Sequence, residues 1–295
     1  MIDLHNHTIN SDGDFTTKEV LLEAFKNGLS ILSITDHNNI SSYDEIRTLN
    51  VKDYYNGKII TGVELEFQMN GRLFDMLGYG FDVDKIRESE IIKKGLIHST
   101  VEGETKILNK LKEICDRYNI KYSNNLHIEN ANNMANDVLL DDIISYKENK
   151  SILDEFGIFD RSTFYRRHFC EPKSPFYIDQ TEGKYDVEYV IKVIRDAGGK
   201  TFFAHPFAYK LSNIKEIIDD LVSKNLLDGI ECEHRKHTNE QIEWLINYCN
   251  NHNLLKSGGS DRHTIHHLIG HCCNNSKEIK EELVKDWIND INAFY

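Results

Sequence analysis

Leu29-Ser30-Ile31-Leu32-Ser33-Ile34-Thr35-Asp36-His37 is the stretch that decides the fold, because an apolar run ends there in an acid and a histidine. Its first seven residues are apolar enough for a buried strand. The helix that precedes it opens at a capping box on Thr16 and ends at Gly28. A second apolar strand follows at residues 59–63. This alternation of strands and helices predicts parallel strands that helices connect.

Asn70-Gly71 interrupts the next segment and is a strong signal for a tight β-hairpin. A two-residue turn at this point places Asp75 opposite Glu66 and diagonal to Glu64. Two or three carboxylates would then come within reach of one site, whereas a longer loop would change this register.

The middle of the chain has a different pattern. One clear helix is predicted at 103–118, a polar, Asn-rich stretch follows it, and few strand signals appear. We therefore predict one α/β domain, residues 1–97 and 178–295, which a mostly helical insertion at 98–177 interrupts. After the insertion, strand–helix alternation resumes with helices predicted at 186–197, 213–225 and 238–252.

The composition narrows the classes of function. The formal net charge is −13, so the chain has no general electrostatic attraction for long nucleic acid. No apolar run approaches the roughly 20 residues that span a bilayer, and residues 1–10 lack the basic start and apolar stretch of a signal peptide. Six cysteines without a Cys-x-x-Cys pair are typical of reduced thiols. We therefore expect a cytoplasmic protein that binds no membrane.

Polar side chains that can bind metal ions occur where the predicted strands end. In a parallel α/β barrel the carboxyl ends of the strands converge on one rim, where active sites lie. Alternation along an extended chain also turns His5 and His7 to one face, and likewise Asp261 and His263. The candidate metal ligands are His5, His7, Asp12, His37, Glu64, Asp75, His205, Asp261 and His263.

Each of these motifs has an ordinary explanation when it is taken alone. His5 and His7 could be surface histidines in a loop, and Asp12 could form an Asx turn. His205 could be a hydrogen-bonded histidine of the core. The shared position of these residues at strand ends is what favours a common site.

The donor set combines imidazole and carboxylate groups without thiolate, which suits Zn²⁺, Mn²⁺ or Fe²⁺ better than Ca²⁺. Nine candidate ligands exceed what a single ion uses, so two or three divalent ions are expected. Clustered ions can produce a bridging hydroxide near neutral pH and can stabilise phosphoryl charge. Hydrolysis of phosphate esters is therefore the predicted chemistry.

The motif order His-x-His, Thr-Asp-His, Gly-x-Glu, Ala-His-Pro and Gly-Ser-Asp-x-His resembles the PHP family, the polymerase and histidinol phosphatase domain. The resemblance implies a distorted (β/α)7 TIM-like barrel and a trinuclear site. Similar proteins usually have His where this chain has Asp75. Carried over residue by residue, the resemblance implies one ion at His5, His7, Glu64 and Asp261, a second at Asp12, His37 and His263, and a third at Glu64, Asp75 and His205.

Within this family the chain looks like the stand-alone nucleotide phosphoesterases with a helical insertion, which act on 3′,5′-bisphosphates and short RNA ends. Residues 233–241 resemble their Tyr-His-Pro-x-His-Ser-Pro-Glu-Gln stretch, and residues 166–169 resemble an Arg-Pro-His-Phe segment of the insertion. We therefore expect His234, Arg166 and His168 to contact the substrate phosphate, and His234 also to protonate the leaving oxygen.

We expect a metal-dependent phosphoesterase that hydrolyses small phosphomonoesters, such as nucleoside 3′,5′-bisphosphates or short RNA ends, through attack of a metal-bridging hydroxide. Asp36 and His234 are the predicted catalytic residues, Asp36 by orienting its neighbours.

Three alternatives stay open. A histidinol-phosphatase-like enzyme for small metabolites fits less well, because that branch has His at the position of Asp12. A metal-binding module without catalysis would be expected to have lost ligands. A metal-dependent amide hydrolase on the same type of barrel typically carries a carboxylated lysine, for which the sequence gives no signal.

Overall fold

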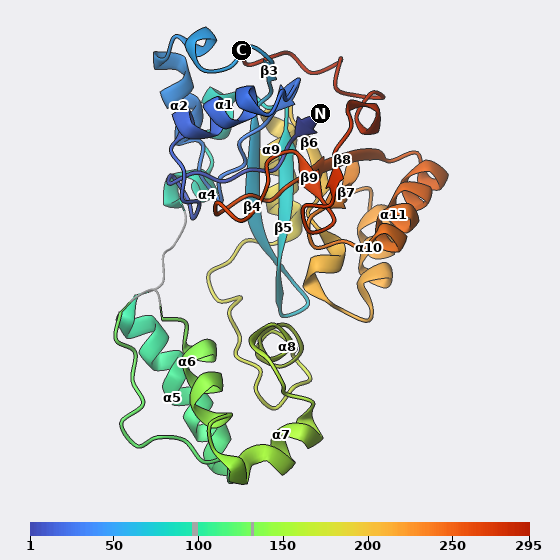
Figure 1. The fold of residues 1–295 in the computed structure, drawn as a ribbon. Helices are drawn as coiled ribbons and strands as arrows, with labels where there is room; N and C mark the ends of the chain where they lie inside the picture. Colours follow the sequence, from blue (N-terminus) through green and yellow to red (C-terminus); the bar gives the residue numbers. More distant parts are fainter. Residues whose placement is uncertain (96–99, 131–132) are drawn as a thin grey trace. The chain divides into compact units, whose positions relative to one another are not determined.

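The computed structural model describes residues 1–95, 100–130 and 133–295, which form two compact units (Figure 1). The first unit comprises Met1–Gln68, Phe74–Leu96 and Lys184–Tyr295, and the second comprises Met69–Leu73 and Ile97–Gly183.

The predicted boundary between residues 97 and 98 lies outside the described residues. The second unit extends to Gly183 instead of ending at 177, and it includes the hairpin tip at 69–73. The tip belongs there because the hydroxyl of Tyr177 donates a 2.6 Å hydrogen bond to the carbonyl oxygen of Gly71.

A small parallel sheet in the first unit begins the chain. Its strand order is β1 (Ile2–Asp3), β2 (Ile31–Leu32) and β3 (Lys58–Ile59). Helix α1 (Thr17–Lys26) connects β1 to β2, and the predicted capping box on Thr16 is confirmed. The regular strands are shorter than predicted. After Leu32, isolated backbone hydrogen bonds to Asp3 and Asn6 take the place of a continuous ladder.

A larger, five-stranded sheet has the order β4-β5-β6-β7-β8. The predicted two-residue turn is confirmed, since Asn70 and Gly71 have φ values of 53° and 75° between β4 and β5. Strand β5 runs antiparallel to β6, whereas β6, β7 and β8 run parallel to one another. The strand bounds are β4 (Gly62–Met69), β5 (Arg72–Tyr79), β6 (Lys200–Phe203), β7 (Gly229–His234) and β8 (Leu255–Gly259).

Isolated parallel bridges link both edge strands of the large sheet to the small sheet. His37, beyond β2, pairs with Glu64 of β4, and Asn6, beyond β1, pairs with Arg262, beyond β8. The amide of Asp261 also donates a 2.8 Å hydrogen bond to the carbonyl oxygen of His5. Each link lies within a motif that the sequence singles out, so the joints between the sheets carry the candidate ligands.

Helices pack against these sheets and bury an apolar core that includes Ile2, Phe202 and Trp287. The three helices predicted after the insertion are confirmed as α9, α10 and α11, and α11 has its predicted capping box on Thr238. The remaining elements of this unit are α2 (Ser41–Thr48), η1 (Val51–Asp53), α3 (Val83–Ile86), α4 (Glu90–Lys94), α9 (Val187–Asp196), η4 (Pro206–Tyr209), α10 (Ile214–Ser223), α11 (Asn239–His252), β9 (His271–Cys272), β10 (Lys277–Glu278) and η5 (Glu281–Leu283).

The second unit is mostly helical and has its own core, in which Leu111, Leu139 and Phe164 are buried. Glu104 joins two of its helices, because its carboxylate accepts a 2.7 Å hydrogen bond from the amide of Ala135. None of the helices that the structure describes, in either unit, is long and apolar enough to cross a bilayer. The elements of the second unit are α5 (Val101–Arg117), α6 (Ala135–Ile143), η2 (Lys147–Asn149), α7 (Lys150–Phe156), α8 (Arg161–Phe164) and the π-helical turn η3 (Tyr165–Phe169).

Candidate functional site

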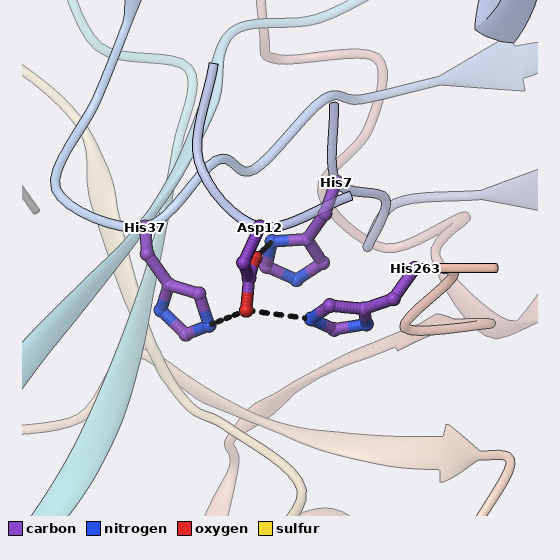
Figure 2. A group of neighbouring side chains, drawn as sticks. All are labelled: His7, Asp12, His37 and His263. Atoms are coloured by element: carbon purple, nitrogen blue, oxygen red, sulfur yellow. Dashed lines mark ion pairs between the residues drawn. The ribbon is translucent and has the colours of Figure 1, made fainter. Parts of the chain in front are cut away.

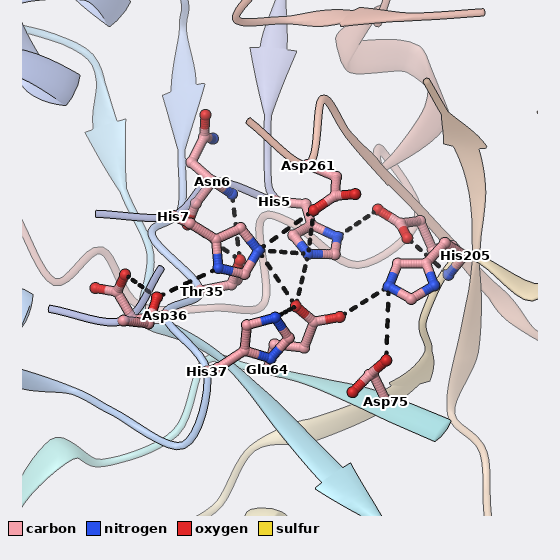
Figure 3. A network of polar contacts seen from close by, with 12 residues as sticks. His5, Asn6, His7, Thr35, Asp36, His37, Glu64, Asp75, His205 and Asp261 are labelled. Atoms are coloured by element: carbon pink, nitrogen blue, oxygen red, sulfur yellow. Dashed lines mark hydrogen bonds and ion pairs between the residues drawn. The ribbon is translucent and has the colours of Figure 1, made fainter. Parts of the chain in front are cut away.

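The nine candidate ligands come together in the first unit, where the strand ends meet (Figures 2 and 3). They form four overlapping groups, and in each group one ligand atom per residue lies within 4.8 Å of the others. We call these nine residues the His–carboxylate cluster. The groups are His7, Asp12, His37 and His263; His5, His7 and Asp261; His5, Glu64 and His205; and His37, Glu64 and Asp75.

The best-formed part of the cluster is a set of four buried ligand atoms. Nε2 of His5 lies 3.1 Å from Nε2 of His7 and 3.0 Å from Oε2 of Glu64. Oδ1 of Asp261 lies 3.7 Å from the His5 nitrogen and 3.4 Å from the His7 nitrogen. Four ligands at tetrahedral angles around an ion, with bonds of about 2.0–2.1 Å, are about 3.3 Å apart. The distances of the two histidine nitrogens from each other and from the two carboxylates are therefore those expected between ligands of one metal ion.

Without a cation, this arrangement holds protons. Burial acts to lower the pKa of His7, but hydrogen bonds to Asp261 and Glu64 outweigh burial and raise this pKa to about 10. The pKa of His5 is likewise raised well above its ordinary value, because the charges of Glu64 and Glu231 outweigh its burial. A divalent ion can replace these protons among the same carboxylates.

Glu64 lies in the middle of the cluster and offers its two oxygens to different histidines. Its Oε2 is 3.3 Å from Nε2 of His37, and its Oε1 is 2.9 Å from Nε2 of His205 (Figure 3). Burial acts to raise the pKa of Glu64, but the neighbouring charges of His37 and His5 lower it well below its ordinary value. An ionised carboxylate in this position can bridge two cations.

Asp12 gathers a second group of histidines (Figure 2). Its Oδ2 lies 3.2 Å from Nε2 of His263 and 3.8 Å from Nε2 of His37, and its Oδ1 lies 3.4 Å from Nδ1 of His7. The loop reaches this position because Gly13 follows, where an added Cβ would lie 2.5 Å from the His7 carbonyl oxygen. Although burial opposes it, the histidines hold the pKa of Asp12 far below its ordinary value.

The third group, around Asp75, is wider. Oδ2 of Asp75 lies 3.9 Å from Nε2 of His205 and accepts a 3.0 Å hydrogen bond from the hydroxyl of Tyr209. Burial and the charge of Glu64 raise the pKa of Asp75 to about 6. With two carboxylates and one imidazole, this group has a higher proportion of oxygen donors than the set of His5, His7, Glu64 and Asp261.

Glu231 is a buried glutamate at the site that sequence reasoning missed. Its Oε1 accepts a 2.9 Å hydrogen bond from Nδ1 of His5, and its Oε2 accepts a 2.8 Å hydrogen bond from the amide of His205. Glu231 therefore fixes the ring of one candidate ligand and the backbone of another. One sequence signal could have pointed to Glu231. It is a glutamate within β7, a fully buried strand that ends at His234.

Asp3 makes a similar connection between the two ends of the chain. Its carboxylate accepts hydrogen bonds from the amides of His5, Ser260 and Gly270, at 3.2, 3.0 and 2.6 Å. The first motif and the last motif of the sequence are therefore held together by one buried side chain.

Asp36 lies where it can orient its neighbours, which is the role expected of it. Its carboxylate accepts hydrogen bonds from the amide and hydroxyl of Thr8 and from the hydroxyls of Ser11 and Ser42, at 2.5–2.9 Å. These bonds anchor the loop between His7 and Asp12. The geometry gives Asp36 a positioning role.

His234 is held by hydrogen bonds at both ring nitrogens. It is fully buried, its Nδ1 accepts a 3.1 Å hydrogen bond from the amide of Lys236, and its Nε2 therefore donates to Oδ2 of Asp261 at 3.1 Å. Burial lowers the pKa of His234 to about 3, so the ring is neutral at pH 7. With both nitrogens engaged, His234 orients Asp261, and its contact with the substrate phosphate and its role as leaving-group acid stay predictions.

Arg166 and His168 belong to the second unit, in the π-helical turn η3. The guanidinium of Arg166 lies over the ring of Tyr165, and Nδ1 of His168 is 3.3 Å from Oγ of Ser174. Turns of this type frequently occur at functional sites. Their contact with substrate stays a prediction.

Comparison with known proteins places this site in a family. The chain matches the family model of the PHP domain over residues 3–292. It is 26% identical over 267 residues to a 5′-3′ exoribonuclease of Haemophilus influenzae, covering 88% of this chain and 89% of that protein. It is 22% identical over 280 residues to a 3′,5′-nucleoside bisphosphate phosphatase of Chromobacterium violaceum, covering 89% and 87%.

Among solved structures, the fold is similar to that of an amidohydrolase from Chromobacterium violaceum with bound sulfate and no metal. The TM-score is 0.61 at 22% sequence identity, over 96% of this chain and 95% of that one. Since the family match extends over nearly the whole sequence, the chain belongs to the PHP domain family.

Proposed function

We propose that this protein is a metal-dependent phosphoesterase that hydrolyses small phosphate monoesters, with nucleotides as its substrate class. The observation that carries the proposal is the buried carboxylate of Glu64, whose two oxygens face His37 and His205 as a bridge between cations would. The PHP family and its relatives support the class of reaction, because two of them are named as a phosphatase and an exoribonuclease.

The His–carboxylate cluster would hold three divalent ions, shared out among its residues as the family resemblance implies. Nitrogen and oxygen donors without thiolate favour manganese, zinc or iron. When bound, such ions supply positive charge to the phosphoryl oxygens and make an attacking water more acidic.

The protein's own groups prepare this site before substrate arrives. Glu231 fixes His5, and neutral His234 donates its Nε2 proton to Asp261. Asp36 holds the loop that carries Asp12. These buried contacts keep the ligand atoms in place, so binding of ions and substrate requires little rearrangement.

The substrate class rests on three kinds of support. The relatives are named for activity on RNA and on nucleoside bisphosphates, at 26% and 22% identity. The net charge of −13 disfavours long polyanions and agrees with a small substrate or a short oligonucleotide. Arg166 and His168 of the insertion are proposed as further phosphate contacts.

We also propose that the linked sheets form the distorted (β/α)7 barrel of the family. The bridges of His37 with Glu64 and of Asn6 with Arg262 support this arrangement, since they connect β4 and the end of β8, the two edge strands of the large sheet, to the small sheet. Such a barrel brings the strand ends to one rim, where active sites lie.

The test uses protein stripped with a chelator, reloaded with Mn²⁺ and assayed with an aryl phosphate and a panel of nucleoside bisphosphates. Asp261→Ala and His37→Ala should lose bound metal and most of the activity. His252→Ala removes a histidine at the exposed end of α11 and should leave both unchanged. Retained metal and retained turnover in both cluster variants would contradict the proposal, and metal binding without any turnover would favour a non-catalytic module.

A further inference from the structure

Arg235 is a cationic residue beside the His–carboxylate cluster. Its Nε donates a 3.2 Å hydrogen bond to the carbonyl oxygen of Asp261, and its Nη2 lies 3.4 Å from Oδ2 of the same residue. The other oxygen of Asp261 is the one that faces His5 and His7. One carboxylate therefore separates the guanidinium from the best-formed ligand set.

The backbone around Arg235 is fixed. The residue follows β7 directly, in a turn that the amide of His237 closes on the carbonyl oxygen of His234. The amide of Asn274 donates a 2.7 Å hydrogen bond to the carbonyl oxygen of Arg235. The guanidinium is thus presented from a held position and is not at the end of a free loop.

Charge compensation of Asp261 does not account for this arginine. His234 already donates a hydrogen bond to Oδ2 of Asp261, and the histidines of the cluster surround Oδ1. A guanidinium so close to a site for several divalent cations repels those cations and lowers their affinity. Its position is favourable once an anionic ligand lies between the arginine and the ions.

Part of the cluster is exposed, so a ligand from solvent can reach it. The side chains of His5, His7 and Glu64 are at most 1% exposed, whereas those of Asp12 and His263 are 43% and 22% exposed. Arg235 is also partly exposed, at 19%. Among the residues that the structure describes, the bond from Nε is the only hydrogen bond donated by its side chain, so most of its N–H groups can meet a ligand.

We propose that Arg235 binds the phosphoryl group of the substrate, presenting its guanidinium to oxygens of the phosphate that bound metal ions would hold. This inference rests on the proposed phosphoesterase function and adds a residue to it. A guanidinium matches a tetrahedral phosphate with paired N–H donors, which an ammonium group cannot do.

The experiment compares the Mn²⁺-loaded wild-type protein with Arg235→Gln and Arg235→Lys. Calorimetric titration with inorganic phosphate gives the dissociation constant, steady-state hydrolysis of an aryl phosphate gives KM and kcat, and elemental analysis gives bound manganese. Arg47→Gln is the matched control, since Arg47 is an exposed arginine whose partner is Asp84 on the protein surface.

We expect Arg235→Gln to weaken phosphate binding and to raise KM by about tenfold or more, as loss of a charge-assisted hydrogen bond does. Arg235→Lys should lie between this variant and the wild type, and Arg47→Gln should match the wild type. Bound manganese should be the same in all four proteins.

Two results would overturn the inference. The first is equal phosphate affinity in Arg235→Gln and the wild type, or no phosphate binding by the wild type. The second is loss of manganese from both Arg235 variants, because Arg235 would then act by holding Asp261. A wild type that binds phosphate through Arg235 but hydrolyses no phosphoester would contradict the proposed function and leave this contact standing.

Discussion

Glu231→Gln is the substitution whose effect the structure defines most closely. The ionised carboxylate accepts the Nδ1 proton of His5, which leaves Nε2 of that ring as the lone-pair donor toward the cluster. Burial acts to raise the pKa of Glu231, but the nearby charges of His5 and His234 lower it, so the group stays ionised. Its second oxygen holds the amide of His205.

The carboxamide of glutamine can satisfy only one of these two contacts as an acceptor. If its oxygen keeps the His205 amide, its NH₂ group faces Nδ1 of His5 and favours the tautomer with the proton on Nε2. That tautomer cannot bind a cation through Nε2. Substitution of a residue that hydrogen-bonds to a metal ligand typically lowers metal affinity by about 10- to 100-fold, which corresponds to about 1.4–2.7 kcal/mol.

The assay is a competition titration of Mn²⁺ or Zn²⁺ between the protein and a chromogenic chelator. Glu233→Gln is the matched control, because Glu233 is also buried on β7 but its partner is Lys277, outside the cluster. We expect weaker metal binding in Glu231→Gln alone. The tautomer argument would be refuted if Glu231→Gln bound metal within about twofold of the wild-type affinity. It would also be refuted if both variants lost the same amount of metal affinity.

Three further predictions concern the same cluster. Asp36→Asn turns an amide group toward the donors of Thr8, Ser11 and Ser42, so it should lower the free energy of unfolding by about 2–4 kcal/mol in urea denaturation; an unchanged midpoint would show that Asp36 does not anchor the loop. Asp75→His exchanges an oxygen donor for nitrogen, so after loading from equal Zn²⁺ and Mn²⁺ elemental analysis should find a higher zinc share than in the wild type, and an equal or lower share would contradict this. His7 has a pKa raised to about 10 without metal, so it is protonated at pH 7; ion binding should therefore release protons and strengthen from about pH 6 to pH 9, and calorimetry in buffers of different ionisation enthalpy that detects no proton release would contradict this sign.

Local signals in the sequence predict much of the fold. The capping boxes on Thr16 and Thr238 and the turn at Asn70-Gly71 depend on neighbouring residues, and all three form as expected. The convergence of the candidate ligands follows from their position at strand ends, which also explains why the family and the class of reaction could be predicted.

Only some of the residues that support the ligands, such as Asp36, could be found in the same way. The hydrogen bond between His5 and Glu231 joins side chains 226 positions apart, and no local pattern marks such a pair. The motif of His234 predicts a contact with the substrate, but it gives no sign that burial and the amide of Lys236 hold the ring against Asp261. Sequence reasoning identifies which groups gather at a site, while the direction of each side chain depends on packing.

Titration of Mn²⁺ into the stripped protein, with hydrolysis of an aryl phosphate measured at each step, tests the central claim most directly. The account predicts no turnover without metal and a rise in turnover only as the sites of the His–carboxylate cluster fill beyond the first ion, with no rise in Asp261→Ala. Full occupancy of the cluster without phosphate release, or equal turnover in the stripped and loaded protein, would contradict it.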